Sequence, residues 1–154
     1  MEAMQNTENQ PSMEMMTRIQ QLKEAHAKDP GNYEVNKELA NNYYDLQRFE
    51  KAIKYYQQAL RIRDNDPNLL IDLGLAYFGS NRPDSAVHFV EKALQIQPDH
   101  RQGLYNLGII FYNLEQPAKA IEFWQKLVNL HPVSEEARVA KDLIKQVQEQ
   151  LNKS

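Results

Sequence analysis

The hydrophobic residues of this chain recur at the spacing of amphipathic α-helices, and the pattern itself repeats. The stretch from residue 70 to residue 99, LIDLGLAYFGSNRPDSAVHFVEKALQIQPD, has the pattern of one helical hairpin. Close copies lie on either side of it at a period of 34 residues. The repeated positions are Leu39, Leu73 and Leu107; Ala40, Gly74 and Gly108; Tyr43, Tyr77 and Phe111; Ala52, Ala86 and Ala120; and Tyr56, Val90 and Trp124. A fixed period in this range predicts a solenoid of stacked units.

The pattern predicts eight helices, separated by turns rich in Pro, Gly, Asp and Asn. Their expected ranges are 13–27, 33–46, 49–62, 67–80, 83–96, 101–114, 117–130 and 134–151. Pro83 and Pro117 occupy equivalent positions in two hairpins, and proline suits the first turn of a helix. The last helix has one apolar stripe, which would shield the final unit from water.

These helices group into a single predicted domain, residues 13–154, which follows a polar tail at residues 1–12 that we predict to be disordered. Within the domain we expect a half repeat at 13–30, full repeats at 33–66, 67–100 and 101–134, and a capping helix at 135–152. Pro30 lies two periods before Pro98, so the first helix falls in register as the second half of an incomplete repeat.

The residue types and their spacing resemble the tetratricopeptide repeat, whose pattern runs aromatic-x2-Leu-Gly-x2-Tyr, then Ala-x3-Phe, then Pro. The middle copy matches this pattern at Leu70, Leu73, Gly74, Tyr77, Ala86, Val90, Ala93 and Pro98. In the first copy, Asp64 replaces the closing proline. The resemblance covers residues 33–134. It implies an all-α, right-handed superhelix of helical hairpins.

Composition narrows the choice of partner and compartment. The 154 residues carry a net charge of −3, with both signs spread along the chain and no basic block suited to nucleic acid. No run approaches the ~20 apolar residues of a membrane span, and the polar N-terminus is not a signal peptide as written. We therefore expect no nucleic-acid partner and no membrane span, whereas the sequence leaves the compartment unknown, with a cytoplasmic location as the default. A periplasmic location is the alternative if an N-terminal segment has been removed.

The sequence contains no arrangement typical of a catalytic, metal or cofactor site. It has no cysteine and no glycine-rich phosphate loop. The four histidines, His26, His88, His100 and His131, fall in different helices and turns and form no i, i+4 pair. No isolated pair of carboxylates lies in an apolar setting that would shift a pKa. The prediction is a protein without enzymatic activity, metal or cofactor.

In the family that the chain resembles, the first helix of each pair lines a concave groove that binds peptides. By register, the resemblance implies that the groove residues are Lys37, Asn41, Tyr44, Ile71, Asp72, Leu75, Phe78, Tyr105, Asn106, Ile109 and Tyr112. Tyr44, Phe78 and Tyr112 form a ladder with one aromatic ring per repeat. An exposed apolar strip of this kind would mark a partner site. The alternative is that some of these rings pack between helices or under the capping helix.

One branch of the family grips the C-terminal carboxylate of chaperones with five clamp residues. Lys37 and Asn41 match the first two in type and spacing. Asp72 at the third position would repel a carboxylate, and Gln102 at the fourth carries no positive charge. Asn106 at the fifth is a weaker donor than arginine. The sequence therefore argues against chaperone-tail binding.

The function that this pattern favours is non-catalytic. The groove would bind a peptide or an amphipathic helical segment of a partner, in a scaffold or assembly role. Self-assembly is one alternative, because the leading helix lacks a hairpin partner and would leave Met15, Met16 and Ile19 uncovered for a homodimer. A chaperone-like holdase is another, since the sequence is similar in general repeat style to small bacterial proteins that hold unfolded apocytochrome c.

Overall fold

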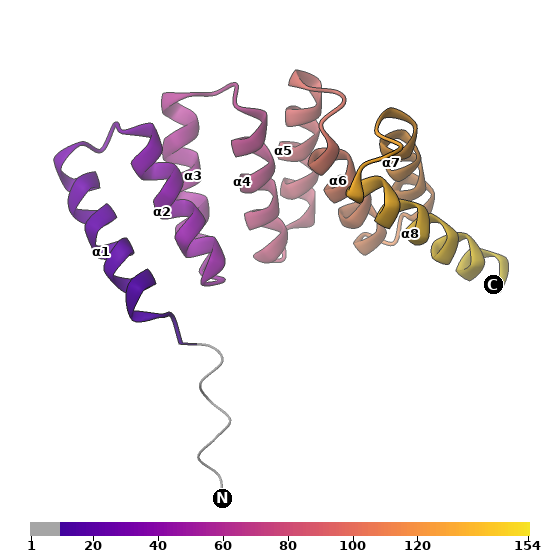
Figure 1. Ribbon diagram of the computed structural model, residues 1–154, viewed down its shortest axis with the longest axis horizontal. Coiled ribbons are helices and arrows are strands. Elements are labelled where there is room, and N and C mark those ends of the chain that lie inside the picture. The colour runs from indigo at the N-terminus through magenta and orange to yellow at the C-terminus, as the bar shows by residue number, and fades with distance from the viewer. Residues whose placement is uncertain (1–9) are drawn as a thin grey trace, which may run out of the picture. The chain divides into compact units, whose positions relative to one another are not determined.

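The structure, a computed structural model, describes residues 10–154, which form only α-helices and connecting turns (Figure 1). The helices of this range are α1 (Met13–Lys28), α2 (Tyr33–Asp45), α3 (Phe49–Ile62), α4 (Pro67–Gly79), α5 (Pro83–Ile96), α6 (Arg101–Asn113), α7 (Pro117–Leu130) and α8 (Glu135–Asn152). Each lies within one residue of its predicted bounds, so the all-α class is confirmed. Residues 1–9 of the predicted tail lie outside the described residues. Within the described range, none of the helices is both long and apolar enough to span a bilayer.

Local sequence explains where the helices begin. The side chains of Ser12, Asn32 and Ser134 precede α1, α2 and α8, and each accepts a hydrogen bond from the backbone N–H three residues further on. Asp66 caps α4 in the same way, and Pro67 occupies the first helical position. Proline also begins α5 and α7, as the sequence predicts.

The chain divides into two compact units, one ending at Arg63 and the other beginning at Asp64. In the first unit, α1 packs against α2, and α2 forms a hairpin with α3. Its buried apolar residues are Ile19, Leu22, Tyr33, Leu39, Ala40, Tyr43, Ala52, Ile53, Tyr56 and Ala59. The expectation that Ile19 is uncovered is wrong, because this side chain belongs to that core, whereas Met16 is 49% exposed.

The second unit contains two hairpins, α4 with α5 and α6 with α7. Helix α6 also packs on α4 and α5, and α8 packs on α7 and α6 (Figure 1). One face of α8 is buried through Ala137, Ala140, Ile144 and Val147, so this helix covers the last hairpin as predicted. Leu151, at the end of the same stripe, is 46% exposed.

The two helices of a hairpin approach closely where the sequence places its small residues. A Cβ atom added to Gly74 would lie 2.7 Å from Cγ2 of Val90, and one added to Gly108 would lie 2.1 Å from Nε1 of Trp124. A stacked aromatic pair follows further along each hairpin, formed by Tyr43 and Tyr55, Tyr77 and Phe89, or Phe111 and Phe123. The small residues therefore allow the helices to cross, and the aromatic pairs fill the space beside the crossing.

Each hairpin turn ends its first helix with a residue in the left-handed backbone region. The three residues are Gln47, Asn81 and Glu115, with φ of 56°, 62° and 57°. In the last turn, Glu115 N donates to the carbonyl of Tyr112 and Gln116 N donates to the carbonyl of Phe111, at 3.1 and 2.9 Å. This pair of bonds is a Schellman motif, which normally has glycine or asparagine at the left-handed position.

The turn therefore predicts a stabilising substitution. Glu115→Asn should raise the free energy of unfolding by about 0.5–1 kcal/mol, because asparagine tolerates the left-handed region better than glutamate does. Asn81 already fills the equivalent position in the preceding turn. Urea denaturation followed by circular dichroism would measure the change. Glu115→Val is the matched control and should be destabilising, since a β-branched side chain is strained at positive φ.

Candidate functional site

In the first unit, all three predicted groove residues make contacts within the unit. The ammonium of Lys37 lies 5.9 Å from the ring centroid of Tyr33. The Oδ1 atom of Asn41 accepts a hydrogen bond of 2.6 Å from the hydroxyl of Tyr56. The half-buried ring of Tyr44 meets Phe49 edge-on, with centroids 5.5 Å apart. Two side chains that the clamp comparison singled out, Lys37 and Asn41, are thus already engaged by tyrosines.

On α4, one predicted groove residue is not accessible. Ile71 is 1% exposed, and its Cδ1 atom would lie 3.2 Å from a Cβ atom added to Gly103 at the start of α6. The expectation that Ile71 contributes to an exposed strip is therefore wrong, because this side chain packs between α4 and α6. Asp72, Leu75 and Phe78 on the same helix are half-buried.

On α6, the predicted groove residues differ in their exposure. Tyr105, Asn106 and Ile109 are half-buried, and Tyr112 is 43% exposed. The hydroxyl of Tyr112 donates a hydrogen bond of 3.1 Å to Oε1 of Gln150 on α8. One rung of the predicted aromatic ladder is therefore tied to the terminal helix, which is the alternative that the sequence left open.

The structure brings two of these residues, Tyr105 and Asn106, into an open polar cavity of about 630 Å³ at the start of α6. We call this hollow the polar cavity. It is lined by Asn68, Gln97, Asp99, His100, Arg101, Gln102, Tyr105, Asn106, His131 and Glu136. A second hollow, of about 510 Å³, contains Tyr112 and lies between α6 and α8. Asp72, Leu75, Phe78 and Ile109 line neither of these two hollows.

His100 is both the N-cap of α6 and a link to α4. Its Nδ1 atom accepts a hydrogen bond of 3.2 Å from Gly103 N, so the ring proton must lie on Nε2. Nε2 then donates to Oδ1 of Asn68, at 2.8 Å. Burial lowers the pKa of His100, and Arg101 acts in the same direction, while Asp99 and Asp66 oppose the shift. The cap therefore requires the neutral imidazole.

This geometry predicts that the protein loses stability in mild acid. The imidazole of His100 binds a proton more readily in the unfolded state than in the folded state. The contribution of His100 to the free energy of unfolding is therefore fully present above pH 6.5, and it is lost as the pH falls through the lowered pKa. Urea denaturation across this range should show stability rising with pH. His100→Asn keeps a capping oxygen but does not titrate, so it should reduce the dependence of stability on pH. His88→Gln, at an exposed histidine, should leave that dependence unchanged. An unchanged slope in His100→Asn would contradict this account.

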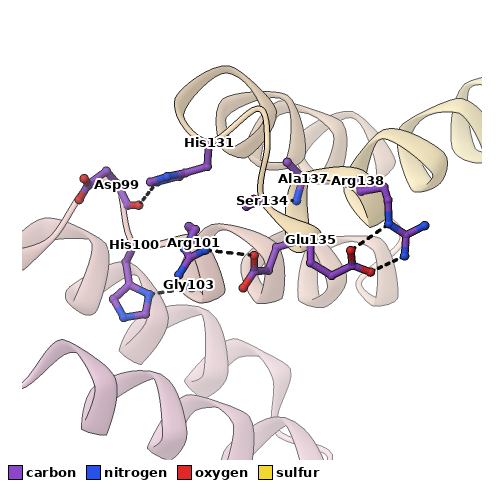
Figure 2. A network of polar contacts seen from close by, with 10 residues as sticks. Asp99, His100, Arg101, Gly103, His131, Ser134, Glu135, Ala137 and Arg138 are labelled. Carbon is purple, nitrogen blue, oxygen red and sulfur yellow. Dashed lines mark hydrogen bonds and ion pairs between the residues drawn. The ribbon is translucent and has the colours of Figure 1, made fainter.

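Two further contacts close the edge of the polar cavity (Figure 2). The imidazole of His131 points at the turn before α6, where Nε2 donates to the carbonyl oxygen of Asp99 at 2.5 Å. Arg101 faces Glu136 at the start of α8, with 3.6 Å between nitrogen and oxygen. The side chains of His131 and Arg101 are thus held by partners from the turn before α6 and from α8.

The groove residues that were predicted from the repeat register include only two of the residues that line this cavity, Tyr105 and Asn106. The other lining residues come from the turns and first helical turns, whereas the register selects positions further along the first helix of each repeat. A signal was nevertheless present, because Asn68 and His100 are 32 residues apart, as are Asp99 and His131. In the first unit, His26 and Gln58 have the same separation, and their side chains lie 3.0 Å apart. Polar pairs nearly one period apart thus indicate contacts between neighbouring repeats.

Two family models, both described as tetratricopeptide repeat, match the chain. One covers residues 33–99 and the other residues 71–135, so together they include nearly all of the three predicted full repeats. No curated protein sequence matches the chain.

Several solved structures share the fold. The crystal structure of MamA has a TM-score of 0.74 and 19% identity, over 91% of this chain and 92% of that chain. A tetratricopeptide repeat protein from Parabacteroides merdae has a TM-score of 0.78 and 19% identity, over 90% of this chain and 55% of that chain. The first repeat domain of Spaghetti (RPAP3), bound to the HSP90 peptide SRMEEVD, has a TM-score of 0.70 and 19% identity, over 78% of this chain and 93% of that chain. At this identity the likeness shows the fold alone.

Proposed function

Because this chain belongs to the tetratricopeptide repeat family, we propose that it binds a peptide segment of a partner protein along α4 and α6. The polar cavity is the observation that carries this proposal, because it combines an accessible hollow with two residues of the predicted groove, Tyr105 and Asn106. The half-buried apolar side chains of Leu75, Phe78 and Ile109 would extend the contact along the same two helices. The role is that of a scaffold or assembly factor.

A chaperone tail is not the partner that these residues favour. A similar fold binds the HSP90 peptide SRMEEVD in Spaghetti (RPAP3). In this chain, Asp72 would repel a carboxylate, and Lys37 already lies over Tyr33. Gln102 adds no positive charge to the polar cavity. The partner segment we propose is therefore not a carboxylate-rich C-terminus.

The proposed role is also non-catalytic. Three of the four histidines make hydrogen bonds within the protein. His26 pairs with Gln58, His100 with Asn68, and His131 with the backbone carbonyl of Asp99. Within residues 10–154, no three His, Cys, Asp or Glu side chains are grouped closely enough to hold a metal ion. Proteins of this family act through the surfaces that their hairpins present.

The groove proposal predicts a separation of binding from folding. The double variant Phe78→Ala and Tyr112→Ala should weaken partner capture at least tenfold, because aromatic anchors usually dominate a protein interface. Its helicity by circular dichroism should stay close to that of the wild type, since Phe78 is only half-buried and Tyr112 is exposed. Pull-down from cells of the native host, followed by mass spectrometry, would provide the comparison. The exposed His88→Ala on α5 is the control.

Two outcomes would contradict this assignment. If the double variant captures the same partners as the wild type, the site lies elsewhere. If it unfolds, the two rings are part of the core. Tyr112→Phe distinguishes the ring of Tyr112 from its hydrogen bond to Gln150, because only the hydroxyl is lost.

Self-assembly is the second candidate, and the exposure of α1 favours it. Met13 is 85% exposed and Met16 is 49% exposed, so the leading helix presents two flexible apolar side chains to solvent. Such a surface could pair with a second copy around a two-fold axis. Sedimentation velocity over a wide range of concentrations would test this. A monomer throughout would eliminate the homodimer, and Met16→Glu should dissociate one that forms.

A further inference from the structure

A further hollow, of about 370 Å³, lies between α5 and α7, the second helices of the two hairpins in the second unit. Its apolar lining includes Leu94, Leu107 and Phe123. Leu107 is 0% exposed, whereas Leu94 and Phe123 are half-buried. We call this hollow the α5–α7 groove. It shares no lining residue with the polar cavity, so it is a separate surface.

Opposite charges lie on the two walls of the α5–α7 groove without pairing. Glu91 of α5 and Lys126 of α7 both line the groove, and both side chains are exposed. Neither makes an ion pair or a hydrogen bond with another group among residues 10–154. The groove therefore has a partly exposed apolar floor between a carboxylate and an ammonium that are both available to a partner.

The same charges recur two helical turns earlier on each wall. Asp84 precedes Glu91 by seven residues on α5, and Lys119 precedes Lys126 by seven residues on α7. Residues at this separation lie on one face of a helix. Both Asp84 and Lys119 are exposed, and the ammonium of Lys119 lies 5.1 Å from the ring centroid of Phe111. The α5 wall is therefore acidic and the α7 wall is basic.

The repeat places each of these acidic residues level with a basic one. Helices α5 and α7 are equivalent elements of successive repeats, so residues 34 positions apart lie at the same height. Lys126 follows the position equivalent to Glu91 by one residue, and Lys119 follows the position equivalent to Asp84 by one residue. One residue is a rise of about 1.5 Å. The two walls thus carry matching rows of opposite charge.

A surface with this pattern is complementary to itself. A twofold axis that runs along the groove exchanges the two walls, so the α5 wall of each copy lies on the α7 wall of the other. Glu91 of each copy then meets Lys126 of the other, and Asp84 meets Lys119. The partly exposed side chains of Leu94 and Phe123 meet near the axis and are removed from water.

The other charged side chains near these walls do not oppose this pairing. Glu122 of α7 is equivalent to His88 of α5, so the axis places a carboxylate beside an imidazole. Lys92 follows Glu91 directly and is therefore turned about 100° away around the helix. No like charges are brought together along the two rows.

We infer that the α5–α7 groove is occupied by the same groove of a second copy, in a twofold dimer. Its contacts are the Glu91–Lys126 and Asp84–Lys119 pairs around an apolar centre. Two helices of 14 residues form a small interface, so the dissociation constant lies in the micromolar range. The dimer leaves the polar cavity of each copy open, and it would bind a bivalent partner more tightly than a monomer does.

Sedimentation velocity at two salt concentrations tests whether this dimer forms. Wild-type protein should associate as its concentration rises in about 0.05 M salt. In about 0.5 M salt the dissociation constant should be at least about tenfold higher, because the ion pairs at the edge of the interface are screened.

Charge reversal identifies the surface. Glu91→Lys and Lys126→Glu should each raise the dissociation constant at least about tenfold, since like charges then meet on both sides of the axis. An equimolar mixture of the two variants should associate as the wild type does, because every reversed wall then meets its opposite. Lys141→Glu, at an exposed position of α8, is the matched control and should leave association unchanged.

Carbodiimide cross-linking provides a second measurement that needs no variant. The reagent joins a carboxylate to an ammonium, with loss of water, where the two groups are in contact. The sample would contain equal parts of unlabelled and isotopically labelled wild-type protein. Mass spectrometry should then find Glu91 linked to Lys126 in peptides of mixed isotope content, which arise only between copies.

Three results would overturn the inference. The first is a wild-type protein that stays monomeric in low salt up to about millimolar concentration. The second is a dimer that survives both charge reversals, or one that Met16→Glu dissociates, because the interface would then be α1 or another surface. The third is cross-linking of Glu91 or Lys126 to a different protein and never to a second copy. Partner capture along α4 and α6 is measured separately, so the proposed function does not depend on these results.

Discussion

Gly108→Ala is expected to destabilise the protein by roughly 2–4 kcal/mol, despite the better helix propensity of alanine. The added Cβ atom would lie 2.1, 2.4 and 2.6 Å from three atoms of the Trp124 indole. That ring is 1% exposed and cannot move freely, because its Nε1 donates a hydrogen bond of 3.1 Å to the carbonyl of Tyr105. The clash therefore has to be relieved by shifting α6 from α7 or by breaking a buried hydrogen bond.

The preceding repeats suggest how to rescue this variant. Positions equivalent to Gly108 and Trp124 hold Ala40 and Tyr56 in the first repeat, so that alanine occurs there together with a ring smaller than indole. Trp124→Tyr should therefore recover part of the stability lost in Gly108→Ala, although it should be destabilising alone. Urea denaturation of the four proteins completes a double-mutant cycle.

Gly103→Ala provides the matched control for this series. There the nearest atoms are the flexible ends of Leu94 and Ile71, at 3.0 and 3.2 Å, so the effect should be within about 1 kcal/mol. If Gly108→Ala proves as stable as the wild type, the two helices do not approach as closely as described.

Leu73→Ala is expected to cost about 2–5 kcal/mol, the range typical of a fully buried leucine. Leu73 is 0% exposed, and the loss of its side chain would leave a cavity inside the second unit. Thermal or urea unfolding would measure the effect. A loss below about 1 kcal/mol would show that the site can collapse or that Leu73 is not core.

Leu75, two residues further along α4, makes an informative comparison. Its side chain is half-buried, and it belongs to the proposed contact surface. Leu75→Ala should therefore lower the free energy of unfolding less than Leu73→Ala does. When the two variants are compared at equal concentrations of folded protein, Leu75→Ala should weaken partner capture more. The reverse pattern would mean that the assignment of core and surface on α4 is wrong.

The hydrophobic pattern and its repeat period were enough to predict the helices and their order. Proline at the start of α5 and α7, and the change of hydrophobic pattern at each turn, are local features that a one-dimensional pattern contains. The small residues Gly74 and Gly108 recur at one position of the repeat, and the helices of each hairpin cross closely at that position. These properties depend on neighbours within one or two turns of helix, so they could be predicted without coordinates.

The accessibility of the predicted groove residues depends on contacts between segments that are distant in the sequence. The register assigns Ile71, Leu75 and Tyr112 alike to the groove, yet Ile71 is covered by α6 and the hydroxyl of Tyr112 is hydrogen-bonded to Gln150. In the first unit, the Oδ1 atom of Asn41 accepts a hydrogen bond from the hydroxyl of Tyr56. A periodic pattern identifies a face of a helix, but it does not identify the side chains that other helices bring to that face.

The sequence by itself determined the helices, the hairpins and the close crossings, because each follows from residue size and periodicity within a repeat. Only the tertiary structure decided where a polar hollow forms. Asn68, His100 and Glu136 belong to the starts of three different helices, and packing of α4 and α8 on α6 brings them to one cavity. Such a site exists only where separate helix ends meet, and their meeting depends on how the packed helices are oriented.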